Sequence, residues 1–135
     1  MLFGLTVTVA GTLFLIATLH VMWAARIWWP LGQETALARA VVGSPGIVAM
    51  PGPAVCGLAA LGIAAAGTVP IWPEGSWREW ALLAAAAIFI LRGLAAYVPA
   101  ARRLSPEEPF ATLDRRFYAP LCLILGIAFG VLWMV

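Results

Sequence analysis

Apolar residues in this chain gather into four long blocks and do not alternate with polar ones. The blocks cover residues 2–29, 47–69, 77–98 and 117–135. A helix needs about 20 apolar residues to cross roughly 30 Å of membrane hydrocarbon, and each block meets or approaches that length. Strands of a membrane barrel would alternate at a period of two, whereas AALGIAAAG and ALLAAAAIFIL are continuously apolar. The pattern predicts one all-α domain, an integral membrane four-helix bundle.

The composition supports residence in a membrane. Of 135 residues, 64% are hydrophobic and only 10% are charged, which is unlike a soluble domain. The chain is too short for several domains, so we expect a single four-span domain. A signal peptide is the rival interpretation of the first block. That block has no positively charged start and is longer than a signal sequence requires, so we interpret it as a mature span.

The arginines predict how the spans are oriented. One arginine, Arg78, lies between the second and third blocks. Six lie in or beside the other two connections: Arg26, Arg39, Arg102, Arg103, Arg115 and Arg116. Loops rich in basic residues face the cytoplasm. Both termini are therefore expected on the outer side of the membrane.

Two polar side chains lie inside the predicted spans. Arg92 is about 9 Å from the cytoplasmic end of the third block at 1.5 Å per residue. Its long stem could bend back to the headgroups. Alternatively, Gly93 lets another helix approach closely, and the guanidinium of Arg92 then needs an acceptor within the bundle. His20, the only histidine, lies near mid-membrane with Trp23 three residues later on the same helix face.

Further polar groups are predicted at the same depth. Asp114, Tyr118 and Cys122 are spaced by four residues and share one face if the last helix begins before Asp114. Tyr97 adds a hydroxyl near the interface. The candidates for proton transfer or charge balance are His20 and Asp114. The candidates for ligand contact are Trp23, Arg92, Tyr97, Tyr118 and Cys122. Each also has a packing interpretation, such as a histidine bonded to a neighbouring helix or tyrosines in an interfacial belt.

Several chemistries find no support in the sequence. Metal sites need three or four ligands, and one histidine with Cys56 and Cys122 in different spans does not supply them. A haem would require His20 from two copies of the chain. No glycine-rich phosphate loop is present, and the net charge of +2 reflects membrane orientation. We therefore predict no metal, no cofactor and no nucleic-acid partner.

Three segments carry a resemblance to a known family. LHVMWA, LRGLAAY and PFATLDRRFYAPLCLILG resemble a small bacterial membrane family catalogued as domain of unknown function 3995. The resemblance implies a four-span protein of a bacterial inner membrane, but it does not imply any particular reaction. Members carry an aspartate a few residues beyond the third-span arginine, where this chain has Ala95 and Ala96. Asp114 or Glu34 is then left as the counter-charge for Arg92.

Two classes of function remain from the sequence. The first is an intramembrane site that binds, and modifies if His20 acts as acid or base, a small amphipathic molecule such as a lipid, quinone or isoprenoid. The second is an accessory subunit that packs small residues against a membrane protein partner or a second copy. A transporter is a weaker third hypothesis. A common cavity lined by His20 and Arg92 would favour the first.

Overall fold

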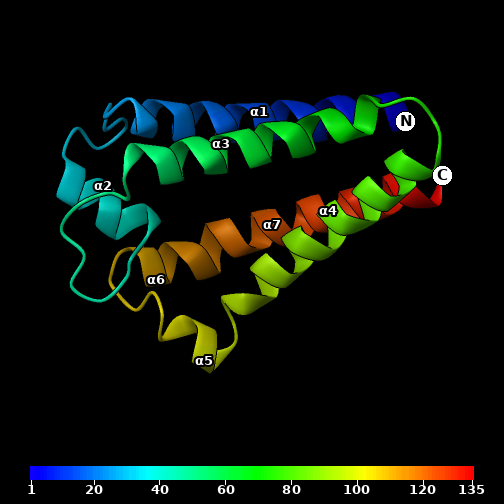
Figure 1. Ribbon diagram of the computed structural model, residues 1–135. Coiled ribbons are helices and arrows are strands. Elements are labelled where there is room, and N and C mark those ends of the chain that lie inside the picture. The colour runs from blue at the N-terminus through cyan, green and yellow to red at the C-terminus, as the bar shows by residue number, and fades with distance from the viewer.

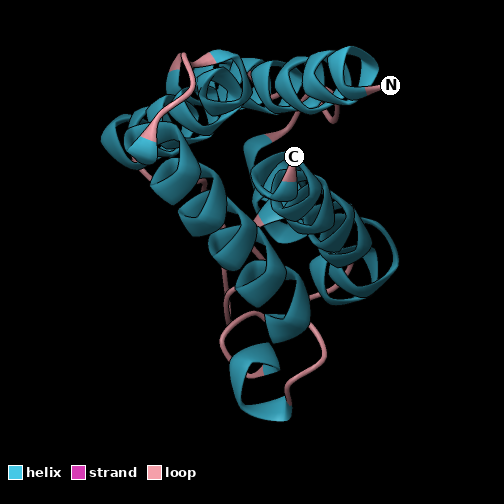
Figure 2. Ribbon diagram, turned by 90° about the vertical axis from the view of Figure 1, so that its right-hand side faces the viewer, coloured by secondary structure: helices cyan, strands magenta, loops and turns pink.

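Every regular element of the protein is helical. The computed structural model describes residues 1–135 and contains no strand, as Figure 2 shows. The long helices are α1 (Leu2–Ala24), α3 (Pro53–Thr68), α4 (Ser76–Ala95) and α7 (Ala119–Met134). The short elements are α2 (Glu34–Val41), the 3-10 turn η1 (Val69–Ile71), α5 (Pro99–Arg102), α6 (Phe110–Leu113) and the π-helical turn η2 (Asp114–Tyr118). The predicted all-α class is confirmed.

The long helices are arranged as two pairs. Helix α1 packs along α3, and α4 packs along α7. Figure 1 places both chain termini at one end of the molecule, which we call the terminal end. Helices α2, α5 and α6 lie at the opposite end, which we call the loop end. The two pairs lie one above the other in this view, and between the pairs α1 contacts α7.

Three stretches of helix are long and apolar enough to cross a membrane. They are Leu2–Ala24, Pro53–Ile71 and Phe110–Met134. Helix α4 is outside this set because it carries Arg78, Glu79 and Arg92. Many large apolar side chains are exposed on the surface, as expected where lipid is the solvent. These features indicate a membrane protein.

The first two helices are shorter than the sequence predicted. The first was expected to reach residue 29 but ends at Ala24, because Arg26 adopts a left-handed backbone with φ of 61°. The second was expected from residue 47 but begins at Pro53. Proline fits only the first turn of a helix, so Pro51 and Pro53 delay its start.

The last two helices also differ from expectation. Helix α4 ends at Ala95, three residues early, and Val98 is extended (φ −91°, ψ 121°) ahead of Pro99, as residues before proline usually are. The last helix was expected from residue 117 but begins at Phe110 and continues through α6, η2 and α7. Its added turns bring Asp114 onto a helix.

Large apolar side chains fill the core towards the terminal end. Leu13, Leu82 and Phe129 are completely buried there and belong to one cluster that joins the two helix pairs. Helices α4 and α7 approach closely at Gly93 and Gly126, because a Cβ at either position would lie 2.6 Å from a side-chain carbon of the other helix. A second buried cluster at the loop end joins α1, α2 and α3 around Trp23. The two helix pairs do not close completely between these clusters.

Candidate functional site

A largely apolar cavity of about 760 Å³ lies between the two helix pairs. Its walls come from α1 and α3 on one side and from α4 and the α6–α7 helix on the other. Five of the seven residues selected from the sequence line it: His20, Trp23, Arg92, Tyr118 and Cys122. His20 and Arg92 therefore face a common cavity. We call it the apolar cavity.

His20 presents one ring nitrogen without a protein partner. Its Nδ1 lies 2.8 Å from the carbonyl oxygen of Ile16, one turn earlier on α1. A carbonyl only accepts, so Nδ1 carries the hydrogen, and Nε2 of the neutral ring is left as an acceptor. The ring packs against Trp23 with centroids 4.7 Å apart. The indole of Trp23 donates to the carbonyl of Trp29 at 3.0 Å, which fixes both rings at the cavity wall.

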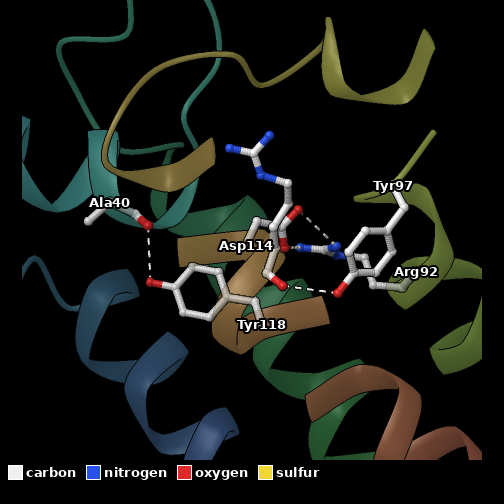
Figure 3. Close-up of polar contacts among 6 residues, drawn as sticks. Ala40, Arg92, Tyr97, Asp114 and Tyr118 are labelled. Carbon is white, nitrogen blue, oxygen red and sulfur yellow. Dashed lines mark hydrogen bonds and ion pairs between the residues drawn. The ribbon is translucent and has the colours of Figure 1, made fainter. Parts of the chain in front are cut away.

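Arg92 forms a two-point ion pair with Asp114. Its Nη2 lies 2.7 Å from Oδ1 and its Nη1 lies 3.4 Å from Oδ2 (Figure 3). The side chain of Asp114 is only 10% exposed, whereas that of Arg92 is 42% exposed. Glu34, the other candidate counter-charge, instead accepts from the backbone N–H of Met50 at 3.2 Å. Arg92 is thus held towards the last helix by Asp114.

A π-helical turn determines how Asp114 and its neighbours point. The N–H of Ala119 donates to the carbonyl of Asp114, five residues back. The next donor in that register would be residue 120, which is proline and has no N–H. The carbonyl of Arg115 consequently accepts from outside the helix, and the hydroxyl of Tyr97 donates to it at 2.9 Å.

This turn makes the predicted common face of Asp114, Tyr118 and Cys122 wrong. Asp114 points to α4, whereas the hydroxyl of Tyr118 donates to the carbonyl of Ala40 on α2 at 3.1 Å (Figure 3). Tyr118 and Cys122 line the apolar cavity, and Asp114 does not. Tyr97 lines no large cavity and is an exposed residue. Asp114 therefore contacts the lining of the apolar cavity through its ion pair with Arg92.

A second cavity of about 670 Å³ lies at the loop end. We call it the arginine cavity, because four arginines line it together with two carboxylates: Arg92, Arg102, Arg103, Arg115, Asp114 and Glu108. In the sequence, Arg102, Arg103 and Arg115 indicate only the orientation of the spans. These arginines come together because of the way the connection between α4 and α6 folds. The one signal of this in the sequence is that several arginines lie close together in a segment that also contains prolines.

Contacts at the loop end tie the two helix pairs together. The carboxylate of Glu107 accepts from Arg39 and from the N–H of Gly46, each at 3.3 Å. The N–H of Glu107 donates to the carbonyl of Gly43 at 2.9 Å. Gly43 has φ of +67° and lies against Phe110, so no side chain fits there. Neither Glu107 nor Gly43 is part of a pattern that could be recognised in the sequence.

The chain matches one known protein family. The model of the family described as Protein of unknown function (DUF3995) matches residues 13–129. The chain belongs to this family. The residues that match the family model include every residue that lines the two cavities. No curated protein and no solved structure matches the chain. No three His, Cys, Asp or Glu side chains are grouped so that they could hold a metal ion.

Proposed function

We propose that the protein binds a small amphipathic molecule, such as a lipid, quinone or isoprenoid, in the apolar cavity. The single observation that supports this function is the common lining of that cavity by His20 and Arg92 among apolar side chains. Ligand sites in proteins are typically apolar spaces of about 300–1,000 Å³ with a few polar groups that orient the ligand. The apolar cavity, at about 760 Å³, fits that description.

The lining of the cavity favours an apolar occupant. The cavity is partly open to its surroundings, and its lining is mostly apolar. Water in it would therefore find few polar partners. An acyl or isoprenoid chain would instead bury its apolar surface against this lining.

We propose that the protein is a single domain that crosses a bacterial inner membrane four times, with both termini outside. Helix α4 supplies the fourth crossing. Its charged residues Arg78 and Glu79 are in its first turn, and its third charge, Arg92, is paired with Asp114. The concentration of arginines at the loop end supports a cytoplasmic position for that end.

The polar groups of the cavity suggest how a ligand would be oriented. Arg92 would hold an anionic or oxygen-rich group, and Asp114 would position Arg92. The free Nε2 of His20 would accept a proton or a hydrogen bond from the ligand. The rings of Trp23 and Tyr118 would pack against it. Metals and cofactors have no role in this proposal.

Native mass spectrometry of the gently purified protein tests the proposal. We expect a co-purifying amphiphile that is lost in Gly62→Leu, because Gly62 lines the apolar cavity and has open space around it. Gly57→Leu is the matched control, since Gly57 is on the same helix, has open space and does not line the cavity. Equal occupancy in both variants, or no bound amphiphile in the unaltered protein, would contradict the proposal.

A third variant separates a binder from an enzyme. His20→Gln retains a polar side chain but does not exchange protons near neutral pH. If His20 catalyses proton transfer, the ligand recovered from His20→Gln differs from the ligand of the unaltered protein in mass or, where the reaction is an isomerisation, in the fragments that it gives on dissociation. The same mass and the same fragments in both would indicate binding without chemistry.

A further inference from the structure

The arginine cavity contains three arginines that form no ion pair with a protein carboxylate. Arg92 is paired with Asp114, and the other ion pair of the protein joins Arg39 to Glu107 outside this cavity. Arg102, Arg103 and Arg115 have no carboxylate within ion-pair distance.

The second carboxylate of the cavity, that of Glu108, accepts hydrogen bonds at the start of α6. Glu108 accepts from the backbone N–H of Thr112 at 3.1 Å and from its hydroxyl at 2.9 Å. Three guanidinium groups therefore line one cavity without an ion pair, and the four arginines of this cavity outnumber its two carboxylates, which favours an anionic ligand.

The arginine cavity adjoins the apolar cavity. Val41, Arg92 and Phe110 line both. Arg92 has five N–H donors and gives one hydrogen bond to each oxygen of Asp114, so donors remain for a ligand at this boundary. A molecule with an apolar chain and an anionic head therefore finds matching surfaces on the two sides of Arg92.

We propose that the ligand is an amphiphile with a phosphate-bearing head, whose apolar chain occupies the apolar cavity and whose phosphate binds Arg102, Arg103 and Arg115. This assignment rests on the proposed function and narrows its ligand class. Guanidinium groups match phosphate oxygens in two-point geometry, and a phosphate offers several such edges to several arginines at once. A neutral quinone or isoprenoid alcohol would leave these arginines bound only to water.

A pair of amphiphiles that differ only in the phosphate tests this assignment. Oleoyl lysophosphatidate and monooleoylglycerol share the same acyl chain, and each is titrated into the protein in neutral detergent and detected by native mass spectrometry. We expect the phosphate form to bind more tightly. Exposed ion pairs contribute up to about 1 kcal/mol each, which is about fivefold in affinity.

Substitution of the arginines should remove this preference in steps. Arg102→Gln or Arg115→Gln alone should weaken lysophosphatidate about fivefold, and the triple variant that adds Arg103→Gln about 100-fold. Arg116→Gln is the matched control, because Arg116 is adjacent in sequence, exposed and outside both cavities. Binding of monooleoylglycerol should not change in any of them. If the triple variant loses helicity, the single variants decide the question.

Inorganic phosphate distinguishes the source of the anion. If inorganic phosphate alone binds as tightly as lysophosphatidate, or Arg116→Gln weakens binding as much as Arg115→Gln, the phosphate-headed amphiphile is overturned. If both amphiphiles bind equally and Gly62→Leu weakens both, the head assignment fails while the proposed function stands. If neither amphiphile binds and none co-purifies, both fail.

Discussion

Replacing Arg92 should lower the free energy of unfolding more than replacing Asp114, its partner in the ion pair. Arg92→Met leaves a carboxylate that is only 10% exposed without its cation. Removing one partner of a fully buried pair costs about 3–5 kcal/mol. Because the side chain of Arg92 is 42% exposed, solvent already screens this pair, and we expect about 2 kcal/mol. Asp114→Asn leaves a long cation that extends to water, and we expect about 1 kcal/mol or less.

Unfolding by SDS in mixed micelles, followed by circular dichroism, measures these free energies of unfolding. The double variant completes a cycle, and we expect a coupling energy of about 1 kcal/mol between the two positions. Arg39→Met is the control, because Arg39 and Glu107 are 49% and 30% exposed and their pair should contribute less than about 1 kcal/mol. If Asp114→Asn costs as much as Arg92→Met, or the coupling is near zero, Asp114 is not a buried anion held by Arg92.

Two further predictions concern the contacts that support the site. Gly93→Ala places a Cβ 2.6 Å from the Cγ of Leu123 and should cost about 1–3 kcal/mol of unfolding free energy in the same assay. Gly130→Ala, where space is open, should change it by less than about 0.5 kcal/mol, and equal effects would contradict the close helix contact. Tyr97→Phe removes the donor to the carbonyl of Arg115 and should accelerate amide hydrogen exchange across residues 114–118. Unchanged exchange would refute a role for that hydroxyl.

The apolar blocks of the sequence were sufficient to predict the helices but not their ends. A run of apolar residues continues through the positions where the backbone leaves the helix. Arg26, with its left-handed φ, lies inside the block that was predicted to reach residue 29. The prolines at positions 51 and 53 carried a usable signal, because a proline inside a helix costs about 3 kcal/mol. Apolarity alone therefore overestimated the first three helices and underestimated the last, which begins at Phe110.

The candidate site was predictable where it depended on intramembrane polar residues. A charged or imidazole side chain within an apolar block must find a partner or a cavity, and both His20 and Arg92 line the apolar cavity. The position of Asp114 was not predictable in the same way. Spacing by four residues assumes an α-helix, and the π turn before Pro120 rotates Asp114 away from Tyr118.

The arginine cavity could not be predicted from the sequence, because membrane orientation already accounts for arginines between the apolar blocks. Arginines between spans are expected from membrane orientation alone, so Arg102 and Arg103 carried no further signal. Their common cavity depends on contacts between distant segments, such as Glu107 with Gly43 and Gly46. Contacts between segments so far apart in the sequence produce no periodic pattern along the chain.

The small residues that would support an accessory subunit do not form one surface. Helices associate in membranes where small residues on one face permit close approach. Gly62 lines the apolar cavity, and Ala85 and Ala86 are buried in the core of this chain. The exposed ones, such as Ala65 on α3 and Ala84 on α4, are on helices that belong to different pairs. A partner that used both sets of small residues would have to contact both pairs from outside, whereas a ligand in the cavity contacts both from within. A protein complex that persists in mild detergent, together with no effect of Gly62→Leu on bound lipid, would reverse this preference.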